Sequence, residues 1–146
     1  MQLNVAVHGI GGDASLSFTK EHIRVRWKET TLKERRMVGS LVRRARKLNM
    51  QVCTVDADGK PDKPAYSKDL PGLFKNAKGG ELILQQGDKD AIKNIAKELI
   101  EDEIEVGGLV MEAKPDGTWR MLQKGEFKPE PEKKQELQVS RPVGGG

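Results

Sequence analysis

The chain has 146 residues, enough to bury the core of one domain but not of two. Charged residues make up 33% of it and aromatic residues only 4%, and its apolar stretches are a few residues long, so the composition argues against a membrane protein. Cys53 is the only cysteine, which excludes an internal disulfide framework and, without a basic and apolar leader at the N-terminus, favours a cytoplasmic location.

Charge is sorted by segment. The formal net charge of +4 conceals a basic segment, residues 20–47, with eleven Lys and Arg against three Glu. It also conceals an acidic segment, residues 81–105, with eight acids against three Lys. Opposed fields of this kind steer partners or hold elements of the same chain together.

The first half of the chain predicts three strands and a helix. Apolar and polar residues alternate through residues 2–7, 15–19 and 22–27, the period of a strand with one buried face. Thr30 or Thr31 can then cap a helix, and Glu34 would complete a capping box with Thr31. The stripe that this helix buries is Val38, Leu41, Val42, Ala45 and Leu48. Asn49 can end the helix, and residues 50–55 resume as a buried strand.

Residues 56–80 form the longest predicted irregular segment. Three prolines and four glycines interrupt it, so we expect no regular element there apart from a short helical turn near residues 67–74. A segment of this length inside a compact domain is either a functional loop or a structural excursion. The sequence leaves both interpretations open.

The second half repeats the strand and helix pattern. Residues 82–84 predict a short strand, Gly87 and Asp88 a turn and a helix cap, and residues 92–100 an amphipathic helix. Residues 106–112 and 119–122 then predict two strands, joined at the turn-prone Pro115, Asp116 and Gly117 as a hairpin.

These elements predict an α+β domain. We expect two layers, with a mixed sheet of about five to seven strands and two main helices on one face. The domain spans residues 1–126, including the long loop 56–80, and residues 127–146 form a flexible tail rich in Pro, Glu, Lys and Gln. Alternatively, Leu137, Val139 and Val143 in this tail could anchor it as an added strand.

No catalytic, metal or cofactor motif is recognisable. The glycine-rich turn at residues 8–15 lacks the Gly-Lys-Ser/Thr ending of a phosphate loop, and the acids near Gly59 lack the spacing of a calcium loop. His8 and His22 have no spacing that would bring metal ligands together, and Cys53 lies in an apolar run typical of a buried thiol. We therefore name no catalytic residue, metal ligand or cofactor.

Two basic surfaces are predicted. At 100° per residue, one face of the first helix carries cations opposite the apolar stripe. This basic helix surface comprises Lys33, Arg36, Arg43, Arg44 and Lys47. A second basic surface, His22, Arg24 and Arg26, projects from the polar side of the third strand. The two point away from one another, which disfavours one continuous groove for nucleic acid.

An acidic surface is predicted at the end of the second helix, at Glu98, Glu101, Asp102 and Glu105. Negative charge is unfavourable at a helix C-terminus unless a cation compensates it. That cation could come from the first helix of the same chain or from another subunit.

Three functions therefore remain. The first is a small non-enzymatic interaction or assembly module that binds a protein partner or a second copy of itself through these charged surfaces. The second is a nucleic-acid-binding protein that uses the Arg-rich helix 31–48 for phosphate contacts. The third is an enzyme whose site the sequence does not reveal.

Overall fold

The computed structural model describes residues 2–7, 14–28, 31–75 and 79–125. Most of the expected turn at residues 8–15, His8 and the tail 127–146 lie outside these ranges. Within them, one eight-stranded sheet has the order β5-β4-β6-β3-β2-β1-β7-β8. The strands are β1 (Leu3–Val7), β2 (Ala14–Phe18), β3 (His22–Trp27), β4 (Gln51–Val55), β5 (Pro61–Pro64), β6 (Gly80–Gln85), β7 (Val110–Ala113) and β8 (Trp119–Met121).

The predicted α+β class is confirmed, but the prediction of a mixed sheet is wrong, because all described neighbouring strands pair antiparallel. The two long helices do connect strands that run in the same direction. However, β6 lies between β3 and β4 and pairs antiparallel with both. Likewise, β3, β2 and β1 separate β6 from β7. Each crossover therefore spans other strands instead of joining neighbours.

The sheet also has more strands than the expected five to seven. The additional strand β5 lies in the segment 56–80, where no strand was expected because of its prolines. Pro61 and Pro64 are tolerated because β5 is an edge strand, whose outer side needs no backbone donor. The expected helical turn is confirmed by a 3₁₀ turn, η1 (Ser67–Asp69), followed by the short helix α2 (Leu70–Phe74).

Helix α1 (Leu32–Lys47) begins and ends where the sequence predicts. Thr31 is its N-cap, although its hydroxyl donates to the carboxylate of the fully buried Glu34 and makes no hydrogen bond to a backbone amide. Leu48 is the C-cap, and Asn49 follows in the left-handed conformation at φ 61°, which asparagine tolerates.

Helix α3 (Ala91–Glu105) is capped two residues later than expected. Asp90, at φ 63°, is its N-cap in place of Asp88. The amide of Asp88 instead donates to the carbonyl of Leu48 at 2.8 Å, which joins the loop before α3 to the end of α1.

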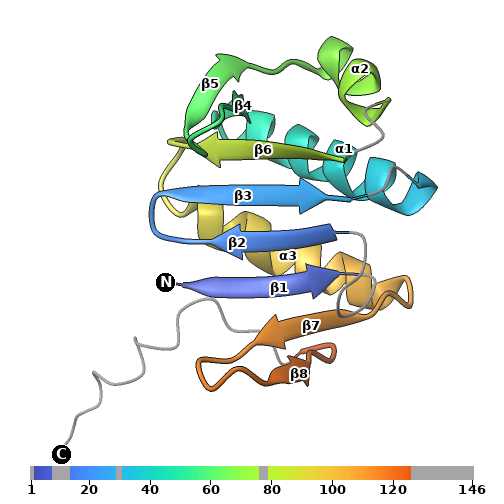
Figure 1. The fold of residues 1–146 in the computed structure, drawn as a ribbon. Coiled ribbons are helices and arrows are strands. Elements are labelled where there is room, and N and C mark those ends of the chain that lie inside the picture. Colours follow the sequence, from blue (N-terminus) through green and yellow to red (C-terminus); the bar gives the residue numbers. More distant parts are fainter. Residues whose placement is uncertain (1, 8–13, 29–30, 76–78, 126–146) are drawn as a thin grey trace, which may run out of the picture.

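The core lies between the helices and one face of the sheet. Figure 1 shows α1 and α3 passing behind the sheet, with their axes roughly along the strands. The apolar side of each central strand packs against them, and each fully buried Leu, Ile or Phe contributes about 1.5–3 kcal/mol. The largest enclosed residues include Leu16, Phe18, Ile23, Leu82 and Leu84 from the sheet, Met37 and Leu41 from α1, and Ile95, Leu99 and Ile100 from α3. No helix in the described ranges is both long and apolar enough to cross a bilayer.

Candidate interaction surfaces

The basic helix surface is exposed. Lys33, Arg36, Arg43 and Lys47 all lie on the solvent side of α1, opposite the buried stripe that the sequence predicts. Within the described part of the chain, no acid forms an ion pair with any of these four. Their charges therefore remain available to an anionic partner.

Arg44 differs from the other cations of α1, because it binds α3. Its side chain is 25% exposed, and its Nη1 donates to Glu98 Oε1 at 2.7 Å. Its Nη2 donates to Asp102 Oδ2, and its Nε donates to Ser40 Oγ at 3.1 Å. Three donors of one guanidinium are thus used within the chain, and the planar fork of arginine suits such a double carboxylate contact.

A hollow of about 400 Å³ lies beside this contact, between α1 and α3. Arg43, Lys47 and Leu48 line it together with Ser40, Arg44 and Glu98. Arg43 and Lys47, which have no acidic partner among the described residues, thus border a concave surface with an apolar patch. A protruding acidic side chain fits such a surface better than it fits a flat helix face.

The predicted acidic surface is largely compensated by cations of the same chain. Arg44 binds Glu98 and Asp102, and Lys124 binds Glu105 with 2.8 Å between Nζ and Oε1. The hydrogen bond and charge of Lys124 hold the pKa of Glu105 below its ordinary value. The same hydrogen bond and the charges of Glu105 and Glu101 raise the pKa of Lys124. These cations offset the unfavourable interaction between the acids at the end of α3 and the helix dipole.

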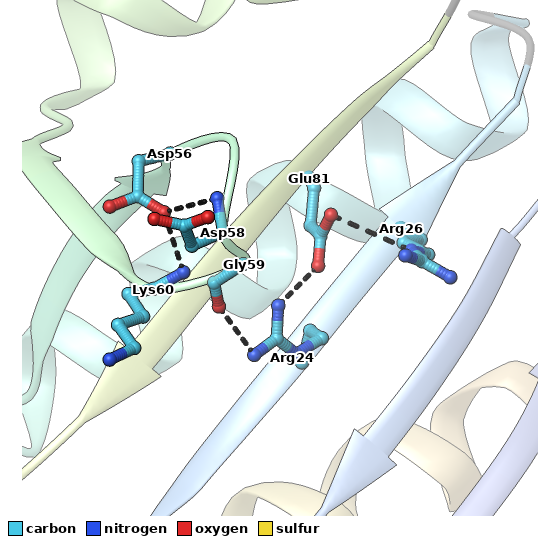
Figure 2. Close-up of polar contacts among 7 residues, drawn as sticks. All are labelled: Arg24, Arg26, Asp56, Asp58, Gly59, Lys60 and Glu81. Atoms are coloured by element: carbon cyan, nitrogen blue, oxygen red, sulfur yellow. Dashed lines mark hydrogen bonds and ion pairs between the residues drawn. The ribbon is translucent and has the colours of Figure 1, made fainter.

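The second basic surface lies on the opposite side of the sheet from α1, because its residues alternate with the buried Ile23, Val25 and Trp27. Figure 2 shows that Glu81 of β6 lies between Arg24 and Arg26. Arg24 Nη1 is 2.5 Å from Glu81 Oε2, and Arg26 Nε is 3.5 Å from Glu81 Oε1. Glu81 therefore offsets part of this surface, while the Arg26 side chain stays 67% exposed. His22, half-buried, pairs across the ladder with Gln85.

Arg24 also holds the turn between β4 and β5 against the sheet. Its Nη2 donates to the carbonyl of Gly59 at 2.8 Å (Figure 2). Within the turn, Asp56 Oδ1 accepts from the amides of Asp58 and Lys60, both at 2.9 Å. Gly59 adopts φ 79°, a conformation that favours glycine. The Asp56 carboxylate thus closes the turn between β4 and β5.

Tyr66 lies beside a cation of α1. The guanidinium carbon of Arg46 on α1 is 5.4 Å from the centre of the Tyr66 ring, which is 51% exposed. Sequence spacing could not show this contact, because η1 reaches the flank of α1 only through the fold of residues 56–70.

Two further features were not found from the sequence. A hollow of about 860 Å³ lies between the turn joining β2 to β3, the loop 85–90 and the first turn of α3. At β8, the last strand at one edge of the described sheet, Trp119 and Met121 are exposed. Both depend on which strands become neighbours, and local patterns do not specify that.

The described residues contain no group of three or more His, Cys, Asp or Glu able to hold a metal ion. Cys53 is buried in β4, and its desolvation raises the pKa of the thiol. A scan against protein-family models, a search of curated proteins and a search of solved structures each found no significant match to this chain.

Proposed function

We propose that this chain is a small, non-enzymatic interaction module that docks an acidic protein surface on α1. The observation that carries the proposal is that the cations of this helix differ in whether they pair with acids of the described chain. Arg44 is used to hold α3, whereas Lys33, Arg36, Arg43 and Lys47 are exposed and have no acidic partner in the described chain.

The contact of Arg44 with Glu98 and Asp102 supports this role, because it fixes the position of α1. Arg44 binds α3 and the buried stripe packs α1 against the sheet, so the helix that carries these four cations is fixed before a partner binds. A pre-organised charged surface loses less conformational entropy on binding and orients the encounter. The hollow beside Arg43 and Lys47 gives such a surface a place for one protruding acid.

The test compares three full-length proteins. One is the wild type, one carries Arg36→Gln, Arg43→Gln and Lys47→Gln, and one carries Lys60→Gln, Lys89→Gln and Lys114→Gln at exposed sites elsewhere. Both variants lose three positive charges, so the difference between them isolates the location of the charge. Arg44 is left intact because it holds α3.

Each protein is chemically crosslinked in cell extract, and the crosslinked peptides are sequenced. We expect a partner whose acidic segment crosslinks to α1 of the wild type and of the control, with at least about a tenfold loss in the helix variant. Equal recovery with all three proteins would reject the proposed surface.

Nucleic-acid binding is the second candidate, and the contact between Arg46 and Tyr66 favours it. An exposed aromatic ring beside a cation is a stacking surface for a base, on the flank of a helix whose cations can contact phosphates. Labelled single-stranded RNA and duplex DNA, titrated across a salt series, test this candidate. Phosphate contacts predict affinity that falls steeply with salt and is lost in the helix variant, whereas an absence of binding at low salt removes the candidate.

A further inference from the structure

The hollow between α1 and α3 is built on one stripe of α1. Ser40, Arg43 and Lys47 stand at positions i, i+3 and i+7, which brings their side chains to the same side of the helix. Long side chains of a helix lean toward its N-terminus, so Arg43 and Lys47 lean toward Ser40. Leu48 and Glu98 also line the hollow, whose volume of about 400 Å³ is within the range of ligand-binding clefts.

The Arg43 guanidinium lies back along the helix over a glycine. A Cβ added at Gly39 would lie 3.4 Å from Arg43 Nη1. Glycine is unfavourable inside a helix, but its lack of a side chain leaves space for this guanidinium. Arg43 therefore reaches back along α1 to the level of Ser40, whose hydroxyl lines the same hollow.

The walls of the hollow carry an excess of positive charge. Three cations, Arg43, Arg44 and Lys47, line it against one acid, Glu98, a formal balance of +2. Glu98 is bound to Arg44, and Asp102, which also binds Arg44, lies outside the lining. One carboxylate of a partner supplies a single negative charge, whereas a phosphorylated serine or threonine supplies about −1.5 to −2 near neutral pH. A phosphoryl group therefore matches the charge of the walls more closely.

The hollow also offers donors from three side chains. Ser40 Oγ accepts from Arg44 Nε at 3.1 Å, and its own hydroxyl proton has no acceptor among the described residues. Arg43 and Lys47 have no acidic partner in these ranges either. A carboxylate presents two acceptor oxygens in one plane, whereas a phosphoryl group presents three in a tetrahedral arrangement. Three separate donor groups therefore suit a phosphoryl group better than a carboxylate.

We propose that this hollow binds a phosphorylated serine or threonine side chain of the protein partner, an inference that rests on the proposed function of α1. Arg43 and Lys47 pair with oxygens of the phosphoryl group, and the Ser40 hydroxyl donates to the remaining oxygen. Leu48 contacts the apolar carbon atoms of the phosphorylated side chain. Arg44 keeps its bonds to α3, so the two walls of the hollow stay in place.

The first experiment titrates two small probes into the isotope-labelled full-length protein and follows the amide resonances of α1 by NMR. The probes are N-acetyl-phosphoserine amide and N-acetyl-aspartate amide. Near pH 7 the phosphoserine probe should bind at least about fivefold more tightly, because it carries nearly one more negative charge. Near pH 5 this advantage should shrink, since the second pKa of a phosphate monoester is about 6.

The aspartate probe also corrects for the protein's own titration, because Glu98 and Asp102 are present in both series. Equal binding of the two probes near pH 7 overturns the inference. An advantage that persists undiminished near pH 5 overturns it as well, because the second phosphate charge would then contribute nothing.

Matched variants locate the bound probe. Arg43→Gln with Lys47→Gln removes two cations that line the hollow, and Lys33→Gln with Arg36→Gln removes two exposed cations of α1 outside it. The first pair should weaken phosphoserine binding at least about tenfold, and the second pair less than about twofold. Equal losses overturn the inference, because binding would then follow the net charge of the helix.

A second experiment separates this inference from the proposed function. The crosslinking in cell extract is repeated after the extract has been treated with phosphatase, and the crosslink to α1 should fall at least about tenfold. An undiminished crosslink overturns the phosphoryl ligand while the docking of an acidic surface on α1 still stands. If neither extract yields a crosslink to α1, the proposed function fails, and the probe titration alone decides whether the hollow binds phosphoserine.

Discussion

The guanidinium of Arg44 on α1 lies 2.7 Å from the carboxylate of Glu98 on α3, and the same group also donates to Asp102. One residue thereby joins the two segments of opposite charge that the sequence separates. The basic and acidic segments of this chain thus contact each other, and Lys33, Arg36, Arg43 and Lys47 are left without an acidic partner among the described residues.

We predict that Arg44→Met lowers the free energy of unfolding by about 1 kcal/mol, because the two ion pairs and the hydrogen bond to Ser40 are lost from a site that is only partly exposed. Urea unfolding at low salt measures the change. Arg43, the neighbouring cation, has no acidic partner in the described part of the chain, so Arg43→Met should change stability by less than about 0.5 kcal/mol.

Repeating the unfolding measurement at high salt distinguishes the ion-pair contribution of Arg44 from its packing contribution. In 1 M NaCl the deficit of Arg44→Met should shrink, since screening weakens the wild-type pairs. A deficit that stays the same size at high salt would assign it to lost methylene contacts instead.

The second prediction concerns the close contact between Gly80 and Trp27. A Cβ added at Gly80 would lie 2.3 Å from Cζ2 of Trp27, a side chain that is 3% exposed and packs edge-on against Phe74 with 5.7 Å between ring centres. Because the indole is enclosed, Gly80→Ala should cost about 1–3 kcal/mol. Thermal unfolding measures the loss.

Gly72 supplies the matched control for this substitution. A Cβ there would meet nothing within 4 Å, and the residue lies in the helix α2. Gly72→Ala should therefore leave stability unchanged or raise it by about 0.5–1 kcal/mol. Equal losses at both positions would contradict the contact described at Trp27.

Much of the fold follows from local patterns, and the rest depends on contacts that such patterns do not contain. Alternation placed β1, β2 and β3 because each buries one side, and Thr31 and Asn49 marked the ends of α1 through their own backbone preferences. β5 was missed because its prolines are compatible only with an edge strand. The antiparallel sheet was missed because a helical crossover does not specify how many strands it spans.

The candidate site divides in the same way. Helical periodicity correctly assigned Arg36, Arg43 and Lys47 to the exposed side of α1. It could not distinguish Arg44 from them, because the packing of α1 beside α3 brings its guanidinium within reach of Glu98. Nor could it relate Arg46 to Tyr66, which is separated from it by β4 and β5.

The third prediction concerns the thiol of Cys53, which is 5% exposed and whose pKa is raised by burial. Iodoacetamide should modify it at least about a hundredfold more slowly in the native protein than in urea. Since the unfolded thiol ionises at lower pH than the folded one, the neutral thiol stabilises the native state below the unfolded pKa, and this contribution is lost as pH rises above it. In Cys53→Ala, the part of the stability loss at alkaline pH that is caused by ionisation of this thiol should be absent.

Arg24 should also affect the rate at which Cys53 is labelled. In the register of the sheet, Arg24, Ile83 and Cys53 lie side by side on the face away from the helices. Arg24 also donates to the carbonyl of Gly59 in the turn that follows β4 (Figure 2). Arg24→Met removes the bond to Gly59 and should speed the labelling of Cys53. Unchanged labelling would show that β4 and β5 exclude the reagent without the help of this turn.

The fourth prediction is a pH dependence at the end of α3. Lys124 lowers the pKa of Glu105 in the folded protein, so the pair stabilises the native state above the unfolded pKa of a glutamate and loses this effect as pH falls through the lower folded value. An NMR titration of the Glu105 carboxyl should report a midpoint below that of an ordinary glutamate. Lys124→Met should return the midpoint upward, whereas Lys97→Met on the same helix should leave it in place.

The central position of β6 has a consequence for synthesis. β6 is made after β3 and β4, yet it is the strand that joins them, so neither can complete its pairing until residues 80–85 have left the ribosome. A nascent chain that stops before that point holds the β1 to β3 meander and the β4 to β5 hairpin as two separate pieces, each with a bare edge. Such edges attract other chains. The nascent chain therefore carries bare strand edges until β6 has joined β3 to β4 and β7 has covered β1.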